Sequence, residues 1–387
     1  MPRAPARGPS RCRLRRIAEG GDSGLTDNLF LDAAEQAVTL LTPLPLVITA
    51  NAVIGRRWAP HVTAILAGFT AGATFLLGAF ELTGPVSGPR NPAGVDIGYM
   101  VTGLIAATLV SKPVRERLSR YLPIKPDNPV HSLALVLAVI LFGTQVSAIA
   151  FTDVLTANLK VPPLAIGDLI AQSAPLAVIA FAGVGLYIRR SFAATSDRLG
   201  LLTPAWWHIT LALGAAGAFW GVGEVSQWLG QTFTPDIAAK VQKSSDHLFG
   251  GLSSGPWGIA ALALLPGFCE EVLFRGALQP RLGLLVTALL FAAIHTEYGL
   301  SFDVVAILVI AIGLGLIRRY VNTTATITCH MTFNLLASFT IAGQFQIAGY
   351  VVSAALLGVS AYAIWQHRRA RANPGADKEA AAEKALR

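Results

Sequence analysis

The chain has 387 residues, of which 53% are hydrophobic and only 13% are charged, and its mean hydropathy is +0.56. A soluble domain carries about twice that share of charged residues, so the composition leaves no room for a sizeable soluble domain and predicts a polytopic membrane protein. The net charge of +8 does not indicate a nucleic-acid partner, because the basic residues stand in short blocks at the ends of apolar segments.

Apolar segments follow one another along the chain, and each is long enough to cross about 30 Å of hydrocarbon. Their periodicity is helical or saturated, so the predicted fold class is all-α: a transmembrane helical bundle of ten or eleven spans. The predicted spans are 36–55, 61–82, 95–111, 130–151, 169–188, 205–229, 257–280, 284–298, 303–317, 323–342 and 347–366.

The first of these segments decides the orientation. Pro43 and Pro45 stand near the middle of 36–55, so we predict that this segment is re-entrant or interfacial. Ten full spans then place both termini in the cytoplasm, where the positive-inside rule puts the arginine-rich residues 3–16 and 368–371. Eleven full spans are the alternative, and the predicted location is the plasma membrane.

The segment Glu270-Glu271-Val272-Leu273-Phe274-Arg275 places two carboxylates and a guanidinium among apolar residues. One ionisable side chain near the bilayer centre costs roughly 2.5–3.5 kcal/mol, so such a group is expected to face a protein interior or a water-filled cavity. Residues four apart share a helix face, which predicts an ion pair between Glu271 and Arg275. Glu270 is rotated by about 100° from Glu271 and is left for chemistry.

Two later segments carry further polar pairs, Phe291-x-x-x-His295 and His330-x-x-x-Asn334. At about 1.5 Å per residue, Glu270, His295 and Asn334 each lie about 16 Å from the cytoplasmic helix ends and His330 about 11 Å, which predicts one common site. A carboxylate and an imidazole around one water are the parts of a general-base hydrolase. A second imidazole and a carboxamide can donate hydrogen bonds to a developing oxyanion.

The three motifs, in this order and on late spans, resemble those of the CAAX-protease and bacteriocin-processing family of intramembrane endopeptidases, which is related to the eukaryotic prenyl-protein endopeptidase. The resemblance covers roughly residues 205–345. It implies a peptidase acting on peptides or membrane proteins within the lipid bilayer, in which Glu270 and His295 activate water and His330 and Asn334 stabilise the oxyanion. The candidate catalytic residues are Glu270, Glu271, Arg275, His295, His330 and Asn334.

On this interpretation the chain divides into five regions. A basic tail, 1–30, precedes the N-terminal membrane helices, 31–200, and the protease core, 201–345. A last transmembrane helix, 346–369, and a polar tail, 370–387, complete the chain.

Several alternatives stay open. The preferred interpretation requires no cofactor, but Glu270, His295 and His330 could instead hold zinc with one open position, as catalytic zinc sites do. A transporter with a polar midplane site is disfavoured because no clear inverted repeat is visible. A non-catalytic bacteriocin-immunity protein is disfavoured because all the motif positions are intact.

Overall fold

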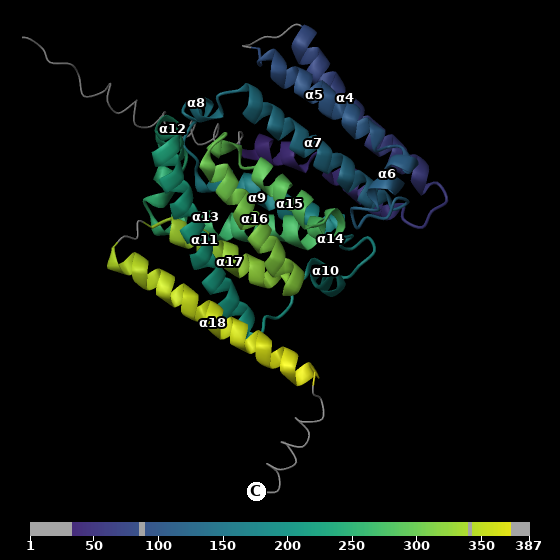
Figure 1. Cartoon of the computed structure of the whole chain (residues 1–387). Coiled ribbons are helices and arrows are strands. Elements are labelled where there is room, and N and C mark those ends of the chain that lie inside the picture. Colours follow the sequence, from purple (N-terminus) through teal and green to yellow (C-terminus); the bar gives the residue numbers. More distant parts are fainter. Residues whose placement is uncertain (1–32, 85–89, 340–342, 373–387) are drawn as a thin grey trace, which may run out of the picture.

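The computed structural model describes residues 33–84, 90–339 and 343–372, and it has no β-strand among them. The all-α fold class is therefore confirmed (Figure 1). The helices are α3 (Leu44–Ala52), α4 (Ala59–Thr83), α5 (Ala93–Thr108), α6 (Lys112–Leu118), α7 (Pro129–Phe151), α8 (Val154–Asn158), α9 (Ile166–Gly183), α10 (Phe192–Leu199), α11 (Trp206–Phe233), α12 (Pro235–Ser253), α13 (Pro256–Glu271), η1 (Val272–Leu278), α14 (Gln279–Leu282), α15 (Leu284–Ala293), η2 (Thr296–Tyr298), α16 (Phe302–Tyr320), α17 (Thr323–Ala337) and α18 (Gln344–Ala372).

Seven described helices are long and apolar enough to cross a membrane, and the bent pair α5–α6 would make an eighth. The chain is thus a multi-pass membrane protein, but the expected count of ten or eleven spans is wrong for the described residues. The predicted spans that are not long, apolar helices in the structure are 284–298, 303–317 and 323–342. There α15 has 10 residues and α17 has 15, which is too short for about 30 Å of hydrocarbon. Helix α16 is longer but carries Asp303, Arg318 and Arg319 at its ends.

The segment around Pro43 is helical on both sides of a short break. Helical residues 33–41 are followed by a turn at 42–43 and then by α3, which has a proline in its first turn. Proline is tolerated there because the first-turn N–H groups have no intrahelical partner. Ala33–Ala52 together are long and apolar enough to cross a membrane. The arginines of residues 3–16 lie outside the described residues, so the predicted cytoplasmic termini stay a prediction.

One hydrophobic cluster joins the N-terminal helices to the later ones. It includes Ala67 of α4, Val136 of α7 and Ala180 of α9 together with Phe274 of η1 and Phe291 of α15. Helices α4 and α5 lie side by side on one flank and α18 lies along the opposite flank against α11 (Figure 1). The two predicted regions on either side of residue 200 are therefore packed as one body, with α13, α15, α16 and α17 between the flanks.

Candidate active site

The first motif lies where α13 passes into the π-helical segment η1. Glu270 and Glu271 are the last residues of α13, and Arg275 lies in η1. The Arg275 Nη1 atom is 3.4 Å from Glu271 Oε1, and the exposed fractions of the two side chains are 1% and 0%. The ion pair predicted from the spacing is confirmed. A π-helical turn inside a helix is rare and occurs frequently at functional sites.

Arg275 holds three helices together in addition to pairing with Glu271. Its Nη2 donates to the carbonyl oxygen of Ala311 in α16 at 3.3 Å. Its guanidinium carbon lies 4.3 Å from the ring centre of Phe291 in α15, a cation–π contact. These contacts fix η1 against α15 and α16, so the buried cation has partners on several sides.

His330 binds Glu271 rather than standing free. Its Nδ1 lies 3.1 Å from Glu271 Oε1, and we assign Nδ1 as the donor because the carboxylate is already paired with Arg275. Helices α13 and α17 approach closely at Gly267, where an added Cβ would lie 3.0 Å from the backbone nitrogen of Met331. The missing side chain at Gly267 lets His330 reach the glutamate.

His295 stands where α15 has ended and is held by its own helix. Its Nδ1 lies 2.8 Å from the carbonyl oxygen of Phe291. A carbonyl can only accept, so Nδ1 carries the proton and, in the neutral imidazole, Nε2 keeps its lone pair. The predicted helix 284–298 is shorter in the structure. Helix α15 ends at Ala293 and has 10 residues, which is about three turns.

Phe291 is the packing centre of the cluster. Its ring lies 5.3 Å from Phe274, 4.8 Å from His295 and 5.8 Å from His330, measured between ring centres. One aromatic side chain therefore orients both imidazoles and the Arg275 guanidinium.

Asn334 is anchored to α13 by a hydrogen bond that a proline makes available. Pro266 inside α13 has no N–H, so the carbonyl four residues earlier, at Leu262, loses its helical partner. The Nδ2 atom of Asn334 donates to that carbonyl oxygen at 3.3 Å. This bond uses one of the two N–H groups of the amide.

Glu270 differs from Glu271 in having no partner within the part of the chain that the structure describes. No hydrogen bond or ion pair in the described part of the chain involves its carboxylate, and its Oε2 atom is buried. A buried carboxylate oxygen is costly without a donor. Water or a polar group of a substrate could supply that donor.

Glu297 is a site residue that the sequence did not reveal. Burial raises the pKa of Glu297, the charge of His295 lowers it and the charge of Glu270 raises it, so the three groups lie near one another. Its backbone oxygen accepts from Asn158 Nδ2 of α8 at 3.2 Å. A continuous helix would have rotated Glu297 away from His295 by about 200°, but α15 has ended before His295 and the short turn η2 (Thr296–Tyr298) follows.

The zinc alternative concerns Glu270, His295 and His330, and it stays untested. Among residues 33–84, 90–339 and 343–372, no group of three or more His, Cys, Asp or Glu side chains is arranged to hold a metal ion. In the set Glu270, His295 and His330, the Nδ1 atoms of both histidines are engaged, with a carbonyl and with Glu271, which leaves both Nε2 atoms free, as in histidines that bind a metal. The Arg275 cation also lies beside the set.

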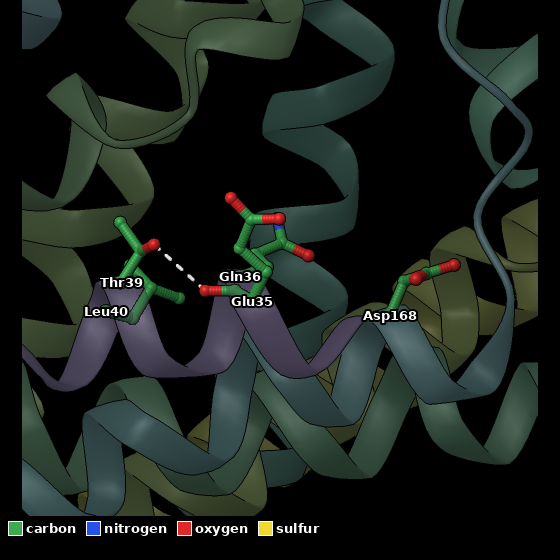
Figure 2. Close-up of a pocket in the computed structure, with 5 residues that line it drawn as sticks. All are labelled: Glu35, Gln36, Thr39, Leu40 and Asp168. Carbon is green, nitrogen blue, oxygen red and sulfur yellow. Dashed lines mark hydrogen bonds between the residues drawn. The ribbon is translucent and has the colours of Figure 1, made fainter. Parts of the chain in front are cut away.

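A hollow on the outer surface lies away from this cluster. Figure 2 shows its lining residues, which are Glu35, Gln36, Thr39, Leu40 and Asp168. They belong to helical residues 33–41 and to α9, and none of them is a candidate catalytic residue. This hollow is therefore not the predicted active site.

Comparisons with known proteins agree with the motifs. Residues 252–336 match the model of a family described as type II CAAX prenyl endopeptidase Rce1-like. A stretch of 75 residues is 44% identical to the uncharacterized protein YpbD of Bacillus subtilis (strain 168), covering 19% of this chain and 39% of that protein. No solved structure gives a significant match. The matched segment contains all six candidate catalytic residues, and this segment of the chain is therefore similar to the Rce1-like type II CAAX prenyl endopeptidase family.

Proposed function

We propose that this protein is an intramembrane endopeptidase of the plasma membrane that hydrolyses peptide bonds in membrane-associated or C-terminally processed substrates. The observation that carries the proposal is the half-buried carboxylate of Glu270, which has no hydrogen-bond or ion-pair partner among the described residues and interacts electrostatically with the turn that follows His295. Both residues lie in the segment that matches a peptidase family.

In the proposed reaction Glu270 and His295 activate one water. The Glu270 carboxylate takes a proton from that water, whose oxygen bonds to the scissile carbonyl carbon, and His295 Nε2 accepts a hydrogen bond from it. When the C–N bond breaks, Glu270 returns the proton to the leaving amine. Water is consumed and one new carboxyl group and one new amine are formed.

His330 is proposed to stabilise the oxyanion, and Glu271 makes that role feasible. With Nδ1 held by Glu271 Oε1, the Nε2 atom of His330 is left for the substrate, and it can donate to the oxyanion when it carries a proton. Arg275 keeps Glu271 as a carboxylate through the 3.4 Å ion pair. Asn334 can add its second N–H, while its first anchors the side chain to α13.

The experiment compares cells that carry the wild type, Glu270→Gln and the control Glu224→Gln. Glu224 is also a carboxylate on a candidate span, but its partner is Gln346 of α18, outside the cluster. Mass spectrometry of new protein termini should find substrate ends in wild type and control that Glu270→Gln lacks. Equal termini in all three strains would contradict the proposal.

Activity measured in the presence of a metal chelator distinguishes the metal-free reaction from the zinc alternative. Since no proposed step runs through a metal, purified protein should keep its activity in a strong chelator at neutral pH. Loss of activity that zinc restores, with stoichiometric zinc in the purified protein, would establish the zinc alternative.

A further inference from the structure

Arginine side chains from four segments lie near one another beside α10 and α14, two helices that lie at the same end of the bundle (Figure 1). Arg190 follows α9, Arg198 belongs to α10, Arg281 to α14 and Arg318 to the last turn of α16. All four are half-buried. The pKa of Arg198 is lowered to about 10, first by burial and then by the charges of Arg281, Arg190 and Arg318. The four residues, called here the arginine cluster, therefore lie close together.

Two members of the cluster are held by the π-helical segment η1. Arg318 Nε donates to the carbonyl oxygen of Arg275 at 3.1 Å, and Arg198 Nη1 donates to the next carbonyl oxygen, of Gly276, at 3.4 Å. Arg318 also packs against Gly200, where an added Cβ would lie 2.9 Å from the guanidinium carbon. The backbone thus holds two guanidinium groups side by side while their remaining N–H groups stay available.

Within the described residues, no carboxylate forms an ion pair with the arginine cluster. The ion pairs found in the described part of the chain involve Lys112, Lys240, Arg275 and His330 on the cationic side and none of the four arginines. Asp197, which precedes Arg198, is exposed and forms no such pair. Half-buried cations without counter-charges favour an anionic ligand.

The neighbouring His131 is in a protonation state that fits an excess of positive charge. It is buried, and its Nδ1 accepts the backbone N–H of Lys125 at 2.9 Å. A ring nitrogen that accepts carries no proton, so the imidazole is neutral and offers Nε2–H as a donor. The charges of Arg281 and Arg198 act on this imidazole. The Nε2 atom of His131 is thus another donor rather than an acceptor.

We propose that the arginine cluster binds the phosphate group of an anionic phospholipid headgroup. Guanidinium groups bind phosphate through paired, charge-assisted N–H bonds, and basic pockets between transmembrane helices bind anionic headgroups. The location favours a lipid over free phosphate, because the candidate spans Ile166–Gly183 and Pro256–Leu282 end next to the cluster. Headgroups lie at this depth, where spans end.

The bound headgroup would connect two parts of the chain. Arg190 and Arg198 precede the family-matched segment 252–336, whereas Arg281 and Arg318 lie within it. One phosphate shared by both pairs would therefore stabilise the packing of the earlier helices on the matched ones. Lipid binding by the arginine cluster is independent of peptidase activity.

The test uses delipidated full-length protein in a neutral detergent, to which phosphatidylglycerol, phosphatidylcholine or inorganic phosphate is added. The readouts are the melting temperature and the lipid retained in native mass spectra. Phosphatidylglycerol should raise the melting temperature of the wild type and phosphatidylcholine should not. In Arg198→Gln/Arg281→Gln the affinity for phosphatidylglycerol should fall roughly thirtyfold, because each arginine near an anionic surface contributes about fivefold.

Two further variants control for charge and for folding. Arg56→Gln/Arg319→Gln removes the same net charge from exposed positions outside the cluster and should keep wild-type lipid affinity. Arg198→Lys/Arg281→Lys keeps the charge and should retain most of the binding even if the glutamine variant folds poorly. Equal lipid affinity in the wild type and the glutamine variant would overturn the proposal. So would a full shift with inorganic phosphate alone, which would assign the cluster to a soluble anion.

Discussion

Replacing Glu271 tests whether Glu271 forms the structural ion pair while the adjacent Glu270 is left for catalysis. Glu271 Oε1 contacts Arg275 Nη1 at 3.4 Å and His330 Nδ1 at 3.1 Å, so Glu271→Gln leaves a buried guanidinium without its counter-charge. Removing one partner of a buried pair costs about 3–5 kcal/mol. The cation–π contact of Arg275 with Phe291 and its bond to Ala311 survive, which favours the lower end of that range.

A double-mutant cycle measures the pair directly. We expect Glu271→Gln and Arg275→Met each to lower the free energy of unfolding, and the double variant to recover about 1–3 kcal/mol of the summed loss, as contacting residues do. The assay is reversible unfolding in mixed detergent micelles. The matched cycle of Glu270→Gln with Arg275→Met should give a smaller coupling energy, since Glu270 acts on Arg275 only at longer range. A coupling energy near zero for Glu271, or a larger one for Glu270, would refute the assignment.

Three further changes address the surroundings of the site. Burial raises the folded-state pKa of Glu297, so the folded protein loses stability as the pH rises from the unfolded-state pKa of this group toward its folded-state pKa. Glu297→Gln should therefore raise the melting temperature at pH 7 more than at pH 4. An equal rise at both pH values would contradict this. Gly267→Ala should cost about 1–3 kcal/mol through overpacking, whereas Gly223→Ala, with no atom within 4 Å of the added Cβ, should cost nothing measurable in the same unfolding assay. Asn334→Ala should lower the free energy of unfolding by about 1–3 kcal/mol, because it leaves the carbonyl oxygen of Leu262 unpaired. Adding Pro266→Ala should restore stability, since the new residue supplies the helical N–H. No recovery in thermal unfolding would count against the proline explanation.

Helical spacing was sufficient to predict the fold class and the Glu271–Arg275 pair, because both depend on local geometry. The contact between His330 and Glu271 was not predictable, since it depends on how closely α13 and α17 approach at Gly267. Glu297 was missed because its place depends on where α15 ends. An apolar pattern does not mark the end of a helix when no capping residue is present.

The span count failed for a related physical reason. Hydropathy reports that a segment avoids water, and it does not distinguish contact with lipid from contact with protein. Helices α15 and α17 are apolar, yet they are too short to cross the bilayer, and residues such as Leu290 and Cys329 are buried by neighbouring helices. Short apolar helices inside a bundle are therefore counted as spans when only the sequence is read.

The most direct test of the central claim follows the oxygen of the attacking water. Purified wild type and Glu270→Gln are placed in lipid vesicles with a membrane-anchored peptide substrate in water enriched in heavy oxygen, after thermal unfolding has shown that both are folded. The wild type should produce a cleaved peptide with one heavy oxygen in its new terminal carboxylate, and Glu270→Gln should produce none. Cleavage by Glu270→Gln at the wild-type rate would contradict the account.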